Sequence, residues 1–222
     1  MRTKPALLTL LIALIHAGVA SAQSLPYNIV DCEGDNRPSQ ITSAVDAALQ
    51  RLVEAEDLAG SNPNAFLSAL DNAFGHWSTT PYDYQAFLVF IVTHTNIRAV
   101  LTNTTGAALS GTAPVFPRVT FRCAFADTGN AATRAGSTIT LYPAFFRDGE
   151  TPLRGNWNWT SATRIGTILH EAVHLAGGPD DIADRAHEQG AMAVVLADNL
   201  DGRALSNAEN YERFYTVPPF EQ

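Results

Sequence analysis

The sequence HEAVH occupies residues 170–174. His170 and His174 are one helical turn apart, about 6 Å along one face, so both imidazoles can reach a single metal ion. Glu171 follows the first histidine, where its carboxylate can hold a zinc-activated water and take its proton. The spacing therefore predicts a zinc helix with a base between two nitrogen ligands.

A tetrahedral zinc site needs a third protein ligand, and candidates follow the motif closely. They are Asp180, Asp181, Asp184 and His187. With Asp180 the pattern becomes HExxHxxGxxD, which is similar to that of the metzincin proteases. That family also places a methionine turn beneath the metal, whereas Met192 falls within a helical pattern.

A second resemblance extends over more of the chain. HEAVH, the stretch GPDDIAD (residues 178–184) and the stretch NAENYERF (residues 207–214) together resemble the aspzincins, the family of deuterolysin and the peptidyl-lysine metalloendopeptidases. The run TITLYPAFF, residues 138–146, resembles the strand that precedes the zinc helix in that family. The resemblance covers about residues 115–216 and implies a zinc metalloendopeptidase of zincin-like fold.

The resemblance also implies roles for the acids after HEAVH. The family's G-T-x-D-x-x-Y block supplies an aspartate ligand, which matches Asp181, and a tyrosine that polarises the scissile carbonyl, which falls on Asp184. An alignment shifted by one turn makes Asp184 the ligand and puts His187 in the tyrosine's place. We expect Asp181 as the third ligand, because Asp-Asp-Ile-Ala matches the family block, with Asp184 and Asp180 as alternatives.

Two acids near the C-terminus predict a substrate preference. Glu209 and Glu212 are three residues apart and so share one helix face. Acids at the matching positions of lysine-specific aspzincins bind the lysine on the leaving side of the scissile bond, which implies cleavage on the N-terminal side of lysine or other basic residues. The chain's only lysine is Lys4, so the rest of the sequence contains none. This absence of lysine agrees with the preference, although the bias of a GC-rich genome explains it as well.

The start of the chain predicts secretion. Basic residues precede a short apolar run, and the Ala-Ser-Ala sequence ending at residue 22 fits signal-peptidase cleavage before Gln23. Cys32 and Cys123 are the chain's two cysteines. In an oxidising compartment we expect these two cysteines to form one disulfide with each other.

Residues 23–222 are long enough for a single metallopeptidase domain with a substantial core. We expect residues 23–114 to form a helical N-terminal part and residues 115–222 the zinc-binding part. Removing residues 1–22 takes away two of the 14 basic residues and none of the 22 acidic ones, which leaves a net charge of −10. This charge argues against nucleic acid or a membrane as partner, and we expect a monomer that acts on proteins or peptides.

Periodicity and turn residues predict the α+β class, mostly helical with a small β-sheet. Helices are predicted over residues 38–58, from Asn62-Pro63, from Thr80-Pro81, from Thr160 or Ser161 through Leu175, over about residues 180–198, and after a capping box of Ser206 with Glu209. Gly177 and the two residues after it end the HEAVH helix. Two β-prone runs, residues 119–125 and 137–141, predict an antiparallel pair.

Two other functions stay open at this stage. One is a metzincin-like secreted protease that uses Asp180. The other is a secreted zinc-binding module with little or no catalysis. This alternative is suggested by Asp184, which stands where the family has its tyrosine. Peptide release from a protein substrate, with and without a chelator, separates an enzyme from a binding module.

Overall fold

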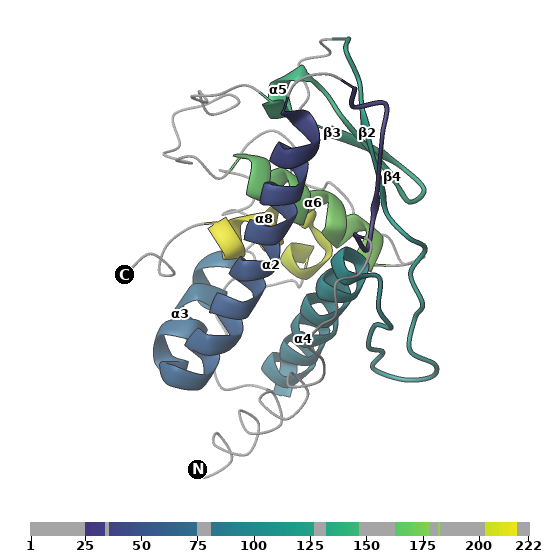
Figure 1. Cartoon of the computed structure of the whole chain (residues 1–222). Helices are drawn as coiled ribbons and strands as arrows, with labels where there is room; N and C mark the ends of the chain where they lie inside the picture. Colours follow the sequence, from purple (N-terminus) through teal and green to yellow (C-terminus); the bar gives the residue numbers. More distant parts are fainter. Residues whose placement is uncertain are drawn as a thin grey trace.

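Three long helices form the first part of the protein (Figure 1). The computed structural model describes residues 25–33, 36–74, 81–126, 132–146, 163–177, 182 and 203–216. The three helices are α2 (Arg37–Ser61), α3 (Pro63–Phe74) and α4 (Pro81–Thr102). Ile41, Val45 and Leu52 recur at helical spacing in α2 and are fully buried. Asn62 caps α3, because its side-chain oxygen accepts a hydrogen bond from the Ala65 backbone N–H at 3.2 Å. These three predicted helices are confirmed.

A four-stranded sheet lies beside the helices (Figure 1). Its strands are β1 (Asn28–Val30), β2 (Thr120–Cys123), β3 (Ala132–Ala135) and β4 (Thr138–Leu141), in the spatial order β1-β2-β4-β3. β2 is parallel to both β1 and β4, and β3 is antiparallel to β4. The predicted antiparallel pairing of residues 119–125 with 137–141 is therefore wrong. Gly136, with a φ of +58°, lets the chain reverse between β3 and β4, so β3 takes the antiparallel position.

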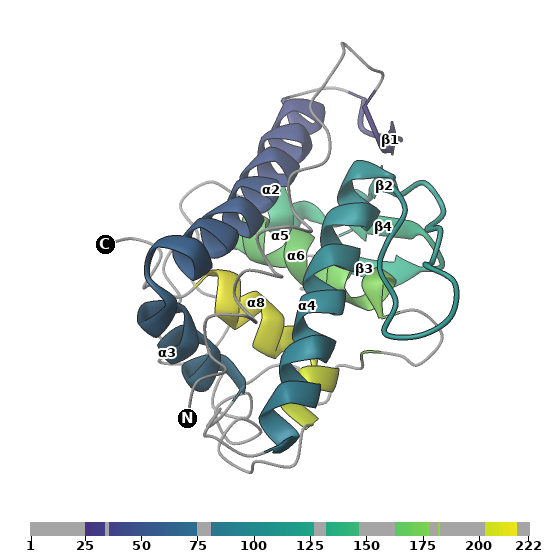
Figure 2. The ribbon, with the colours of Figure 1, turned by 90° about the horizontal axis from the view of Figure 1, so that it is seen from below.

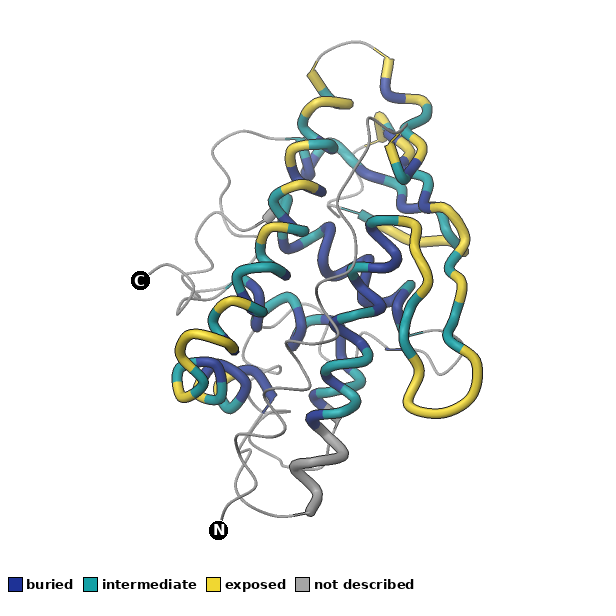
Figure 3. Tube along the Cα trace, turned by 60° about the horizontal axis from the view of Figure 1, so that its bottom comes forward, coloured by how far each residue is buried: buried dark blue, intermediate teal, exposed yellow. Residues whose placement is uncertain are grey.

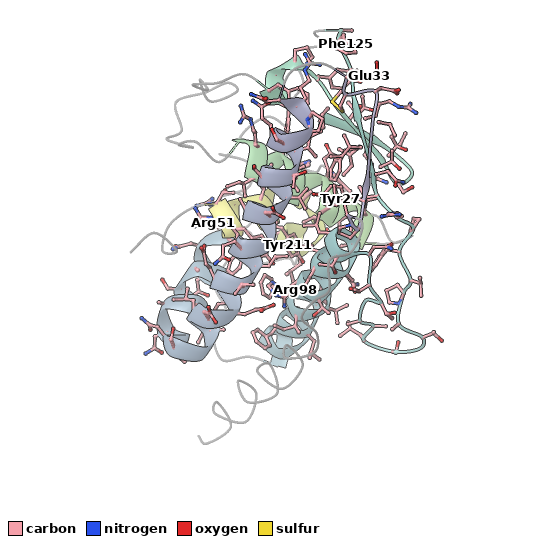
Figure 4. All side chains as sticks on the ribbon, in the orientation of Figure 1. Tyr27, Glu33, Arg51, Arg98, Phe125 and Tyr211 are labelled. Carbon is pink, nitrogen blue, oxygen red and sulfur yellow. A yellow bond between two sulfur atoms is a disulfide. The ribbon has the colours of Figure 1, made fainter. Side chains whose placement is uncertain are left out.

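Cys32 and Cys123 form a disulfide, as the sequence predicts. Cys32 follows β1 and Cys123 is the last residue of β2. Because these neighbouring strands are parallel, both cysteines lie at the carboxyl end of their strands. Figure 4 shows the bond near Glu33 and Phe125. It joins residues 91 positions apart and ties the first strand to the rest of the sheet.

Helix α6 (Thr163–Ala176) carries HEAVH and runs through the centre of the helical part (Figure 2). It contacts α2, α4 and α8 (Ala208–Thr216), and also α5 (Pro143–Phe146) and β3. Its fully buried apolar residues are Ile168, Leu169, Ala172 and Val173. Figure 3 shows buried residues gathered in the middle of the protein and exposed ones along its periphery. The helix ends at Ala176, one residue beyond the predicted Leu175 and directly before Gly177, whose N–H donates to the Val173 carbonyl at 3.0 Å.

Helix α8 follows a 3₁₀ turn, η2 (Arg203–Ser206), and begins one residue later than the capping box predicts. The predicted signal peptide, the start of the HEAVH helix at Thr160 or Ser161, and the predicted helix at 180–198 lie outside the described residues. Within the described residues, one hydrophobic cluster joins the helices to the sheet. The mostly helical α+β class is therefore confirmed. No helix in this part of the chain is long and apolar enough to cross a membrane.

Candidate metal centre

The HEAVH residues lie in the second half of α6 and are buried. His170, Glu171 and His174 are 7%, 8% and 8% exposed. Leu169 and Val173 pack into the core, which fixes the rotation of α6 about its axis. The two histidines, four residues apart, therefore share the face of α6 that meets α8.

The two imidazoles converge through matching nitrogens. Nε2 of His170 lies 3.2 Å from Nε2 of His174. Nitrogens that bind one tetrahedral zinc ion at 2.0–2.1 Å are about 3.3 Å apart, so the side chains already have the separation of a shared ion. Two imidazole nitrogens at this separation are a donor set that suits zinc.

The opposite nitrogens of both rings have oxygen partners. Nδ1 of His174 lies 2.5 Å from the backbone carbonyl oxygen of Ile182, and Nδ1 of His170 lies 3.2 Å from Oε2 of Glu212. Both partners accept hydrogen bonds, so each ring is suited to carry its proton on Nδ1. In that tautomer the two Nε2 atoms, 3.2 Å apart, are the unprotonated nitrogens that zinc binding requires.

Helix α8 brings two carboxylates beside His170. Oε2 of Glu209 lies 3.8 Å from the His170 Nδ1, against 3.2 Å for Glu212. The two glutamate side chains are 18% and 19% exposed. Ligand atoms of His170, Glu209 and Glu212 all lie within 4.8 Å of one another. Besides the histidine pair, these three side chains are therefore a group that could hold a metal ion.

Buried asparagines hold α8 in this position. Asn210 donates from its side-chain amide to the Ala73 carbonyl of α3 at 2.6 Å, and Asn207 donates to the Asn210 side-chain oxygen at 2.5 Å. Both are fully buried, as are the rings of Tyr211 and Tyr215. The NAENYERF motif therefore has an inward face that anchors the helix and another face, with the glutamates, that meets α6.

Of the predicted site residues, His170, Glu171 and His174 lie on α6, and α8 brings Glu209 and Glu212 beside His170. Asp181, the expected third ligand, lies outside the described residues, as do Asp180, Asp184 and His187. The residue after Asp181 is described, and it is the buried Ile182 whose carbonyl contacts His174. The third ligand stays a prediction.

Two features of the site were missed in the sequence. One is the Ile182 carbonyl, a backbone group that leaves no pattern of side chains. The other is Gly166, where an added Cβ would lie only 2.3 Å from Oε1 of Glu212. A lone glycine inside a helical pattern often marks such a close approach and could have drawn attention to this position.

Comparison with known proteins gives a likeness of fold but no likeness of sequence to a family model. No protein-family model matches the sequence, and no curated protein matches it either. The structure is similar to that of a zinc peptidase from Grifola frondosa, with a TM-score of 0.56 and 21% identity over 82% of this chain and 96% of that chain. The two proteins therefore share a fold. This shared fold agrees with the resemblance to aspzincins in HEAVH and NAENYERF.

Proposed function

We propose that this protein is a secreted zinc metalloendopeptidase of the aspzincin type that cleaves on the N-terminal side of lysine residues. The observation that carries the proposal is the 3.2 Å approach of the two Nε2 atoms of His170 and His174, and Glu171 between them in the sequence is also buried. The fold shared with a zinc peptidase supports the same reaction class. HEAVH combines two imidazoles and a carboxylate on one helix, as peptide hydrolysis by zinc requires.

The chain's own residues have distinct tasks in this reaction. His170 and His174 would hold the ion, which would supply Lewis acidity and make water a stronger nucleophile near neutral pH. Glu171 accepts the proton of the attacking water and passes it to the departing amine. Its burial suits a proton carrier that must work with little competition from bulk solvent.

Asp181 is the proposed third ligand. Its chain neighbour Ile182 contacts the His174 ring, which supports a ligand from this segment. Separate Asp180→Asn, Asp181→Asn and Asp184→Asn variants test the assignment through their zinc content. We expect the largest loss at Asp181. The largest loss at Asp184 instead supports the shifted alignment with His187 as the electrophile, and the largest loss at Asp180 supports the metzincin-like alternative.

The acidic pair on α8 is the proposed lysine subsite. Glu209 and Glu212 lie next to the first histidine, so a substrate side chain that reaches them belongs to a residue close to the scissile bond. Two carboxylates bind an ammonium group well because each supplies charge-assisted acceptors. The lysine-free sequence after residue 22 fits such a protease, which then cannot cut itself at its own preferred site.

Secretion and a monomeric state complete the proposal. The apolar segment before Gln23 supports export, and the Cys32–Cys123 disulfide suits an oxidising compartment. Proteins or peptides are the proposed partners, because the strongly acidic chain disfavours nucleic acids and anionic membranes.

Mass spectrometry of a protein digest tests activity and preference together. A lysine-rich and an arginine-rich unfolded protein are incubated with the enzyme, with and without a zinc chelator. We expect new peptides that begin with lysine, and their loss with the chelator. Peptides with no basic preference contradict the lysine subsite, and peptides that persist in the chelator contradict zinc catalysis. An absence of peptides from a chain that binds zinc supports the binding-module alternative.

A further inference from the structure

We propose that Glu212, beyond its place in the proposed lysine subsite, is a positioning residue for zinc binding that holds the His170 ring through its Nδ1 atom. This inference rests on the proposed zinc site and distinguishes two acids that the sequence presents as a pair. Two observations support it: the shorter approach of Glu212 to the His170 ring, and the packing of Glu212 against Gly166 of α6.

The distances separate the two acids. Oε2 of Glu212 is 3.2 Å from Nδ1 of His170, within hydrogen-bond reach, whereas Oε2 of Glu209 is 3.8 Å away. A histidine that binds a metal through Nε2 usually donates its Nδ1–H to a carboxylate or carbonyl, which fixes the tautomer and the orientation of the ring. Glu212 supplies that carboxylate for His170, as the Ile182 carbonyl does for His174.

Helix α6 is shaped to receive the Glu212 carboxylate. A Cβ at Gly166 would lie 2.3 Å from Oε1, 3.1 Å from Cδ and 3.2 Å from Cγ of Glu212. The first of these distances is too short for any real Cβ, so alanine at this position requires the side chain to move. Gly166 is one turn before His170 and therefore on the same face of α6. A glycine here destabilises the helix by about 0.5–1 kcal/mol relative to alanine, and it leaves room for the Glu212 side chain.

The backbone that carries Glu212 is held on both sides of it. Asn210, two residues earlier, donates to the Ala73 carbonyl of α3, and Phe214 and Tyr215, shortly after, are buried in the core. Because α8 is anchored and the Glu212 carboxylate packs against Gly166, this carboxylate fixes the orientation of the His170 ring more firmly than an acid on a mobile surface would. The contact is therefore built by three elements, α3, α6 and α8.

Equilibrium zinc affinity of the full chain, measured by competition with a chromogenic chelator, tests the proposal. Glu212→Ala is expected to weaken zinc binding by about 10–100-fold, the range typical of carboxylate partners of metal-binding histidines. Glu209→Ala is the matched control, because this acid is on the same helix face with nearly the same exposure. It is expected to leave zinc affinity unchanged and to raise KM for lysine peptides.

Gly166→Ala provides a second route that removes no polar atom. The new methyl displaces the Glu212 carboxylate, so zinc affinity falls although helix propensity improves. In the double variant Gly166→Ala/Glu212→Ala the methyl enters vacated space, so zinc affinity is expected to match that of Glu212→Ala alone. Glu212→Gln keeps a neutral acceptor and is expected to recover part of the affinity. The visible absorption of bound Co²⁺ reports ligand geometry directly and should change in Glu212→Ala but not in Glu209→Ala.

Three results overturn the proposal. Unchanged zinc affinity in both Glu212→Ala and Gly166→Ala removes the positioning role while leaving the proposed zinc peptidase intact. Two zinc ions bound by the parent, with one lost in Glu212→Ala, identify His170, Glu209 and Glu212 as a metal site of their own. A parent chain that binds no zinc contradicts both this inference and the proposed function.

Discussion

Two buried histidine clusters in this protein differ in what their ring nitrogens contact. His94 of α4 uses both nitrogens on other helices: Nδ1 lies 2.7 Å from the Tyr215 hydroxyl of α8, and Nε2 lies 3.0 Å from Oε1 of Glu56 in α2. Glu56 also accepts hydrogen bonds from Arg98 at 2.8 and 3.1 Å. Figure 4 shows Arg98 and Tyr211 in this region between α2 and α4. This cluster joins three helices.

The HEAVH cluster directs its nitrogens differently. His170 and His174 place Nδ1 against a carboxylate and a carbonyl, and turn both Nε2 atoms toward one another. Burial of a histidine therefore does not by itself indicate a metal site. The structural histidine, His94, has both ring nitrogens in contact with side chains of other helices. In the histidine pair of HEAVH, each Nδ1 atom contacts an oxygen and the two Nε2 atoms come together.

The largest expected effect comes from removing the base and keeping the ligands. Glu171→Gln should lower kcat/KM by about 10²–10⁴-fold, the contribution typical of general acid–base catalysis. Zinc content should stay at the parent level, because the proposed ligands are untouched. Peptide cleavage and bound zinc are measured on the same sample, and a variant that keeps parental activity contradicts the assigned mechanism.

The second prediction concerns the structural cluster. His94→Ala should lower the free energy of unfolding by about 2–4 kcal/mol, because buried polar groups of Tyr215 and Glu56 lose a partner. Urea denaturation measures this loss. Arg98→Ala is the control and should have a smaller effect, since that side chain is 31% exposed and its ion pair is screened by water. A stability equal to that of the parent would show that the cluster does not hold α2, α4 and α8 together.

The third prediction concerns specificity. Glu209→Gln should lower kcat/KM for peptides with lysine after the cleaved bond by about 10–100-fold, the effect of losing one charge-assisted contact. Peptides with a neutral residue at that position should be cleaved as by the parent. An equal loss on both peptides would assign Glu209 to general support of the site instead of lysine recognition.

The smallest effect is a pH dependence of stability at α8. Burial is the main cause that raises the pKa of Tyr211 and of Tyr215 above the ordinary value of 10.0. Below pH 10 both phenols are protonated in the folded and unfolded chains, so stability is unaffected. Above pH 10 the unfolded chain releases these protons first, and stability falls by up to about 1.4 kcal/mol per pH unit for each phenol. Urea denaturation at pH 9 to 11 measures the slope, and a flat profile contradicts the raised values.

The sequence predicts well what depends on local spacing. HEAVH, the apolar face of α6, and the helix start at Asn62 are all properties of residues within one or two turns. The pairing of β2 with β4 depends on chain direction, which β-prone runs do not encode, and was therefore predicted wrongly. The partners of His94 are 38 and 121 residues away in the chain, and no local pattern marks them.

The site shows the same limit. Glu209 and Glu212 look equivalent in the sequence, and their resemblance to a lysine subsite gives them one role. Only the packing of α8 against α6 separates them, through 3.2 Å and 3.8 Å approaches to the same ring nitrogen. The third ligand stays a sequence prediction, because Asp181 lies outside the described residues.

Zinc content of three purified chains tests the central distinction between the two clusters most directly. The parent, His174→Ala and His94→Gln are equilibrated with the same zinc buffer, and their folding is verified by circular dichroism. We predict about one ion per chain for the parent and for His94→Gln, and almost none for His174→Ala. Full zinc content in folded His174→Ala, or its loss in folded His94→Gln, would contradict the account.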